Sequence, residues 1–182
     1  METATITKTK WTLDPTHSEI GFKVRHMMIT NVSGTFGKFN VSAVTEGNDF
    51  NTAKIEFEAE VDSISTSNPD RDNHLKSADF FDAANHPKMK FVSKRIEKKD
   101  DENYVLTGDL TIRDVTKSVQ FDVEFGGIGK DPWGNEKAGF TLTGKLNRTE
   151  FGLNWNAALE TGGVLVSDDV KLIGEIELVK EA

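Results

Sequence analysis

Apolar and polar residues alternate over much of this chain. Between residues 55 and 60, for example, Ile55, Phe57 and Ala59 alternate with three glutamates. Alternation with a period of two predicts a β-strand that buries one face and exposes the other, which is typical of antiparallel sheets. The same pattern occurs in several other stretches, which span residues 20–26, 89–91, 106–110, 119–125, 140–146 and 170–178.

Turn signals separate these stretches. A Gly-Asn-Asp sequence at residues 47–49 suits a hairpin, residues 98–103 form a charged loop, and Asp131–Gly134 fits a type I turn with proline second and glycine fourth. The pattern predicts an all-β fold of about eight strands, the number at which a barrel is just wide enough for one small ligand. A sandwich of two sheets would show nearly the same alternation, so both remain open.

Three predicted strands place a glycine on the buried side. Gly108, Gly144 and Gly174 each lie between apolar residues two positions away on either side. A glycine inside a strand weakens the sheet, so it marks a bend, a bulge or a close approach by another group. We therefore expect a curved sheet that leaves room inside, and so a binding protein.

One segment breaks the period of two. Asn68 is a suitable N-cap, Pro69 suits the first helical position, and Asp70 and Asp72 favour the positive end of a helix. The spacing predicts a helix to about Ser77, followed by a short turn through Phe80 and Phe81, that covers one mouth of the barrel. A weaker helical candidate spans residues 154–160.

Composition narrows the class of protein. The 182 residues carry a net charge of −8, which argues against a nucleic-acid partner and disfavours anionic membrane surfaces. The absence of cysteine excludes disulfides and thiolate metal sites. No linker or repeat divides the chain, so we expect one domain over residues 1–182 with its core at 11–179.

Neither end of the sequence nor its middle suggests a membrane segment. Met1–Lys10 is polar and lacks the apolar stretch of a secretory signal, and no apolar run is long enough to span a bilayer. We therefore expect a cytoplasmic protein without stable membrane insertion, or a periplasmic one if a leader was removed.

The histidines give little support for metal binding or catalysis. His17, His26, His74 and His86 do not pair at metal-ligand spacing, although a zinc site assembled from distant strands stays possible. The Asp70–His74 stretch suggests acid–base chemistry, but its aspartates are already explained by the helix dipole. We expect no metal, no cofactor and no catalytic residue. His26 continues a buried row and is either a core residue or a polar contact for a ligand head group.

Five phenylalanines share the inward parity, and an ordinary packed core accounts for most of them. The inward glycines favour instead a long apolar tunnel, in which an acyl or prenyl chain gains about 0.8 kcal/mol per buried CH₂. The residues expected to line this tunnel or its mouth are Phe22, Val24, His26, Met28, Phe57, Leu75, Phe80, Phe81, Phe91, Gly108, Leu110, Phe121, Phe140, Leu142 and Gly144. Arg71, His74 and Asn154 are further candidates for head-group contacts.

Several motifs together resemble the YceI-like family of polyisoprenoid-binding, lipocalin-like barrels. The matching stretches are Trp11–Ser18 with Ile20, Phe22 and Arg25–Met27; Asp70–Ser77 with Asp79–Asp82 and Pro87; Leu110–Lys117; and Arg148, Phe151–Leu153 and Val166–Asp168. The first two stretches are long and specific, and the set spans nearly the whole chain.

This resemblance implies an eight-stranded antiparallel barrel with one or two short helices, whose cavity holds an isoprenoid or another long apolar chain. It also makes a homodimer plausible and supplies no catalytic residues. We expect the protein to bind, sequester or transport such a lipid, for example a polyprenyl phosphate or a quinone. The alternatives are an enzyme of isoprenoid or lipid metabolism that uses Asp70–His74, and a ligand-free structural or stress protein.

Overall fold

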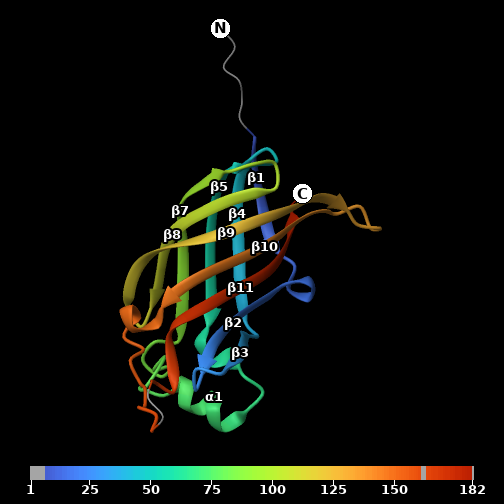
Figure 1. Cartoon of the computed structure of the whole chain (residues 1–182). Helices are drawn as coiled ribbons and strands as arrows, with labels where there is room; N and C mark the ends of the chain where they lie inside the picture. The colour runs from blue at the N-terminus through green and yellow to red at the C-terminus, as the bar shows by residue number, and fades with distance from the viewer. Residues whose placement is uncertain (1–6, 161–162, 182) are drawn as a thin grey trace.

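The computed structural model describes residues 7–160 and 163–181 as a β-barrel with a short helix at one end (Figure 1). Of the polar N-terminal stretch, residues 1–6 therefore lie outside the description. The strands are β1 (Lys8–Leu13), β2 (Glu19–His26), β3 (Thr30–Phe36), β4 (Phe39–Glu46), β5 (Asp49–Glu60), β6 (Ile64–Ser65), β7 (Lys88–Lys98), β8 (Asn103–Ile112), β9 (Val115–Lys130), β10 (Glu136–Asn147) and β11 (Val166–Lys180). Helix α1 spans Pro69–Lys76, and short 3₁₀ turns span Pro15–His17 (η1), Val61–Ser63 (η2) and Arg148–Phe151 (η3).

The barrel closes because the last strand pairs with the first. All neighbouring strands are antiparallel, and the order β1-β4-β5-β7-β8-β9-β10-β11 returns to β1 through the pairs Trp11↔Lys180 and Leu13↔Leu178. This ring of eight strands confirms the predicted barrel and rules out the sandwich. The remaining strands β2, β3 and β6 continue β1, β4 and β5 beyond short interruptions.

Local polar contacts produce the break between β1 and β2. Asp14 accepts a hydrogen bond from the backbone N–H of Thr16 at 3.2 Å, and Pro15 occupies the first position of η1. The strand resumes at Glu19, and β11 pairs with β2 over its first half and with β1 over its last residues. One long β11 therefore holds both halves of the interrupted strand.

The alternation predicts the faces of the strands correctly. In β5, Ala59 is buried between the half-buried Glu58 and the exposed Glu60, and in β8 Leu106 and Leu110 are buried. Two of the three inward glycines, Gly108 and Gly144, however, do not widen the interior as expected. A Cβ added to Gly108 would lie 2.5 Å from Cζ of Phe91, and one added to Gly144 would lie 2.6 Å from Cδ1 of Phe121.

Phenylalanine rings from the neighbouring strand thus occupy the places of these missing side chains. Phe121 lies directly opposite Gly144 in the register, and Phe22 lies opposite Gly34 in the same way. The interpretation of Gly108 and Gly144 as open lumen was wrong because sequence alone does not show which ring packs on which glycine.

Helix α1 agrees with its sequence signals. The side chain of Asn68 accepts a hydrogen bond from the backbone N–H of Arg71 at 3.1 Å, and the helix ends at Lys76 with Ser77 as its C-cap. A turn follows, in which the Phe80 N–H donates to the carbonyl of Ser77 at 3.0 Å. No helix in the described ranges is both long and apolar enough to cross a membrane.

The second helical candidate, residues 154–160, was wrong. This stretch is irregular, and the helical turn η3 lies before it. Gly152 ends η3 in the left-handed region at φ 83°, and the side-chain amide of Asn156 then pairs with both backbone groups of Val166 at 2.7 and 3.0 Å. Such side-chain bonds compete with helix formation.

Candidate ligand-binding site

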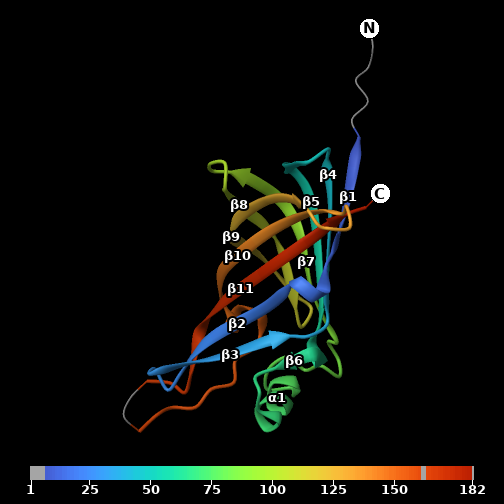
Figure 2. The same ribbon diagram turned by 90° about the vertical axis from the view of Figure 1, so that its right-hand side faces the viewer.

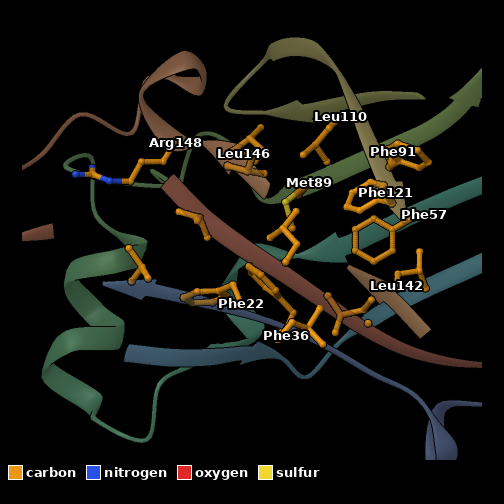
Figure 3. Close-up of a pocket in the computed structure, with 18 of the residues that line it drawn as sticks. Phe22, Phe36, Phe57, Met89, Phe91, Leu110, Phe121, Leu142, Leu146 and Arg148 are labelled. Carbon is orange, nitrogen blue, oxygen red and sulfur yellow. The ribbon is translucent and has the colours of Figure 1, made fainter. Parts of the chain in front are cut away.

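A cavity of about 370 Å³ lies inside the barrel. This volume is in the range of small-molecule sites, which measure roughly 300–1,000 Å³. Phenylalanines from four different strands form much of its wall, namely Phe22 from β2, Phe57 from β5, Phe91 from β7 and Phe121 from β9 (Figure 3). The wall is almost entirely apolar, so it suits a hydrocarbon chain.

Aromatic rings close one end of the cavity. Phe50 is the second residue of β5 and lies next to the β4–β5 turn. This turn is at the opposite end of the barrel from α1 (Figure 2). Its ring centroid lies 5.1 Å from that of Trp11 and 4.9 Å from that of Phe140, and Phe125 stacks on Phe140 at 5.2 Å. Trp11 is fully buried and donates from Nε1 to Thr45 Oγ1 at 3.0 Å. This end is therefore a fixed plug.

Helix α1, the turn after it and the described residues between η3 and β11 cover the other end. His74, Phe80 and Trp155 meet there, with ring centroids 4.7 Å apart for His74 and Trp155 and 5.1 Å apart for His74 and Phe80. All three side chains line the cavity. The cover is thus made of loops and one short helix, whereas the walls are strands.

Arg148 fastens the segment before β11 to the barrel. Its side chain is buried and donates to the carbonyl oxygens of Leu153 at 2.5 Å, Ser167 at 2.9 Å, Trp155 at 3.0 Å and Val166 at 3.3 Å. Burial lowers the pKa of its guanidinium below the usual arginine value. A single buried cation therefore joins two carbonyls of the loop, those of Leu153 and Trp155, to two carbonyls at the start of β11.

Arg113 does the same for the turn after α1. It lies in the tight β8–β9 turn with φ 53°, and its Nη1 donates to the carbonyl oxygens of Phe80 at 2.8 Å and Gly152 at 3.0 Å. The two arginines thus position both loop segments that cover the cavity.

Most of the residues expected at the site do line the cavity. These are Phe22, Val24, His26, Phe57, Leu75, Phe80, Phe81, Phe91, Leu110, Phe121, Phe140 and Leu142, together with the head-group candidates Arg71 and His74.

Four expected residues do not. Gly108 and Gly144 are covered by rings, and Asn154 is exposed. Met28 is 58% exposed because β2 ends at His26 and the chain turns there, with φ 62° at Met28. The extrapolation of the inward row past His26 was therefore wrong.

Sequence reasoning overlooked other lining residues that its own pattern could have found. Arg148 continues the inward row of Phe140, Leu142 and Leu146 by one more step of two. Phe36 lies in the inward row of β3 and also lines the cavity. Trp155 had no such signal, because it belongs to an irregular loop.

The acidic cluster on α1 serves local structure. Asp72 Oδ1 accepts from the backbone N–H and the hydroxyl of Thr66 at 2.7 and 2.6 Å, and Asp70 is exposed in the first turn. His74 Nε2 lies 2.8 Å from Asp79 Oδ2. These contacts explain why the side chains of this stretch are held in place.

A second polar cluster lies outside the cavity, at the β1–β2 break. Asp14, His17 and Glu177 bring three possible metal-ligand atoms within 4.8 Å of one another. Lys137 Nζ lies 2.7 Å from Asp14 Oδ2 and 3.3 Å from Glu177 Oε1, so an ammonium group supplies the positive charge. The hydrogen bond from Lys137 lowers the pKa of Asp14 below its usual value. The cluster is an ion-pair network that fixes this corner.

Comparison with known proteins places this barrel in a family. A UPF0312 protein of Staphylococcus epidermidis is 44% identical over 170 residues, covering 93% of this chain and 96% of that protein. The solved YCEI protein of Campylobacter jejuni is 34% identical, with a TM-score of 0.76 and full coverage of both chains. A solved polyisoprenoid-binding domain from Saccharophagus degradans has a TM-score of 0.63 at 11% identity, over 94% of this chain and 98% of that one, which is a likeness of fold alone. Residues 11–178 match the YceI-like domain, and the chain belongs to that family.

Proposed function

We propose that this protein binds a long apolar molecule inside its barrel and sequesters or transports it. The observation that carries this proposal is the apolar cavity of about 370 Å³ inside the barrel. A chain of about a dozen buried methylenes would gain roughly 10 kcal/mol from leaving water. That gain is of the same order as the unfavourable entropy of association, so the wall needs few polar contacts to hold its ligand.

An isoprenoid is the ligand class we propose. The solved domain from Saccharophagus degradans, which shares the fold, is described as polyisoprenoid-binding. The aromatic rings of the wall, such as Phe57, Phe91 and Phe121, offer flat apolar faces to the double bonds and methyl branches of such a chain. The plug of Trp11 and Phe50 would receive the apolar tail, and the end at α1 would receive the head.

Mass spectrometry of organic extracts from the purified protein tests this function. We expect a long-chain lipid in stoichiometric amount from the native protein. In Leu146→Trp a larger side chain projects into the cavity, so the extracted amount should fall at least severalfold. Val92→Trp adds the same side chain to an exposed position of β7 and should leave the amount unchanged.

Circular dichroism first establishes that both variants fold. Extracts that contain no lipid, together with an apolar probe that fails to bind the native barrel, would contradict a carrier and favour a structural protein. Equal lipid in Leu146→Trp and Val92→Trp would place the lipid outside the cavity and would contradict the proposed site.

A further inference from the structure

The titratable side chains around the cavity are all basic. Among the described residues that line it, these are Arg25, His26, Arg71, His74 and Arg148, and no aspartate or glutamate belongs to the lining. The whole chain, by contrast, carries 30 acidic residues against 22 lysines and arginines. A lining with basic groups alone is therefore a property of this site and not of the composition.

Most of these groups gather at the α1 end. His74 and Arg71 belong to α1, and the ring of His74 contacts those of Phe80 and Trp155. The Cζ atom of Arg148 lies 5.9 Å from the Phe80 ring centroid, and its guanidinium lies at the side of the drawn pocket where α1 lies (Figure 3). The cavity is thus apolar along its length and basic at one end.

Two of the arginines have carboxylates nearby but form no close ion pair with them. Asp72 Oδ1 accepts from the Thr66 hydroxyl at 2.6 Å and so reaches Arg71 only through that group. Arg71 donates from Nε to Thr66 Oγ1 at 2.7 Å and from Nη2 to the Thr66 carbonyl at 2.8 Å, and no carboxylate oxygen in the described part of the chain lies within 4.0 Å of it. A guanidinium has five N–H donors, so Arg71 keeps several free. Arg148 has Asp168 at 3.9 Å, and that aspartate is 61% exposed.

The other basic groups contribute less. His74 faces Asp79 at 2.8 Å, which offsets the charge of a protonated ring. Arg25 belongs to the solvent-facing row of β2 and is exposed. Arg71 is exposed as well, but its two hydrogen bonds to Thr66 hold it at the mouth, and Arg148 is buried behind it.

We propose that the bound lipid carries an anionic head group, a carboxylate or a phosphate, which Arg71 binds at the α1 end of the cavity. This inference rests on the proposed function. A guanidinium matches both oxyanions with two parallel hydrogen bonds, whereas a hydroxyl or amide head group would leave its charge without a partner. The buried charge of Arg148 adds a long-range attraction in a site of low dielectric.

Four probes that share a twelve-carbon hydrocarbon chain but differ in head group test the proposal. Dodecanoate, dodecyl phosphate, 1-dodecanol and dodecanamide are titrated into the protein in 150 mM salt. Trp155 lines the cavity next to His74 and reports binding by fluorescence, in a Trp133→Phe background that removes the exposed tryptophan. We expect both anions to bind at least tenfold more tightly than the alcohol and the amide. Inorganic phosphate at the same concentrations should not displace them, because the chain supplies most of the affinity.

Two variants that each remove one positive charge show whether Arg71 causes the preference for anionic head groups. In Arg71→Gln the anions should lose their advantage, and the affinity for 1-dodecanol should stay within twofold. Lys76→Gln removes a positive charge from the same helix outside the cavity lining and should keep the preference.

The possible failures are distinguishable. Equal binding of anions and alcohol to the native protein overturns the head-group proposal while leaving cavity binding intact. A preference that survives Arg71→Gln overturns the role of Arg71, and displacement of the lipid anions by inorganic phosphate overturns the lipid as the source of the anion. If none of the four probes binds, the proposed function itself fails.

Discussion

At the scale of single residues, the contact between Phe121 and Gly144 shows how the wall of the cavity is built. The Phe121 ring occupies the space that a side chain at residue 144 would need. The glycine therefore makes room on the inner face for the ring of the neighbouring strand. The sequence identifies the inward glycine through its period of two. It cannot identify the ring that covers it, because cross-strand neighbours are set by register.

Gly144→Ala should therefore destabilise the fold. The added Cβ would lie 2.6 Å from the Phe121 ring, so the ring must move, and we expect a loss of about 1–3 kcal/mol in the free energy of unfolding measured with urea. Gly139→Ala is the matched control in the same strand, since nothing lies within 4 Å of its added Cβ. Equal stability of the two variants would show that the packing of the Phe121 ring does not require a glycine at position 144.

Asp14 gives a prediction for pH. Lys137 holds the pKa of this carboxyl below its unfolded value of about 3.9, so the ionised form favours folding. Its contribution is complete above about pH 5 and is lost as the pH falls below 4 toward the folded pKa. We expect Asp14→Asn to be less stable than the native protein by about 1–3 kcal/mol at pH 7, with a gap that narrows below pH 4.

The control for this prediction is Asp169→Asn, which removes an exposed pair with Lys145 at 3.1 Å. Exposed pairs contribute little, so its effect should stay below about 1 kcal/mol. A gap for Asp14→Asn that is constant from pH 7 to pH 2 would contradict the assignment.

At the scale of elements, strands and helix α1 were predictable and the covering loop was not. Strand faces follow from local alternation, and α1 follows from its cap and first turn, which are encoded within a few residues. The described residues of the covering loop, 152–160 and 163–165, are held by guanidiniums that lie outside it, those of Arg113 and Arg148. A pattern confined to neighbouring residues contains no sign of such contacts, and the expected helix at 154–160 failed for that reason.

Arg148→Met should release this loop. The substitution keeps an apolar stem but removes a donor from four backbone carbonyls, of which that of Val166 retains the side-chain amide of Asn156. We therefore expect a loss of about 2–4 kcal/mol and faster amide hydrogen exchange in residues 153–167. Lys145→Met changes an exposed cation near the end of β10, three residues before Arg148, and its exchange pattern should match that of the native protein. Unchanged exchange in 153–167 would show that the loop does not need Arg148.

At the scale of the whole molecule, the barrel and its cavity follow from closure. Alternation alone fits a sandwich as well as a barrel, and the pairing of β11 with β1 decides between them. That pairing joins residues near the two ends of the chain, so no local signal contains it. The reason for expecting the cavity was only partly right. Gly174 lines it, whereas the ring-covered glycines Gly108 and Gly144 do not open it, and the inward phenylalanines that were expected to line it do form its wall.

The most direct test of the account is the affinity of a series of linear alcohols of increasing length, measured by calorimetry. If the chain enters an apolar cavity of fixed size, affinity should rise about fourfold for each added methylene and then level off once the cavity is full. In Leu146→Trp the plateau should come at a shorter chain, and in Val92→Trp it should not move. Affinity that does not depend on chain length would contradict the hollow barrel as the binding site.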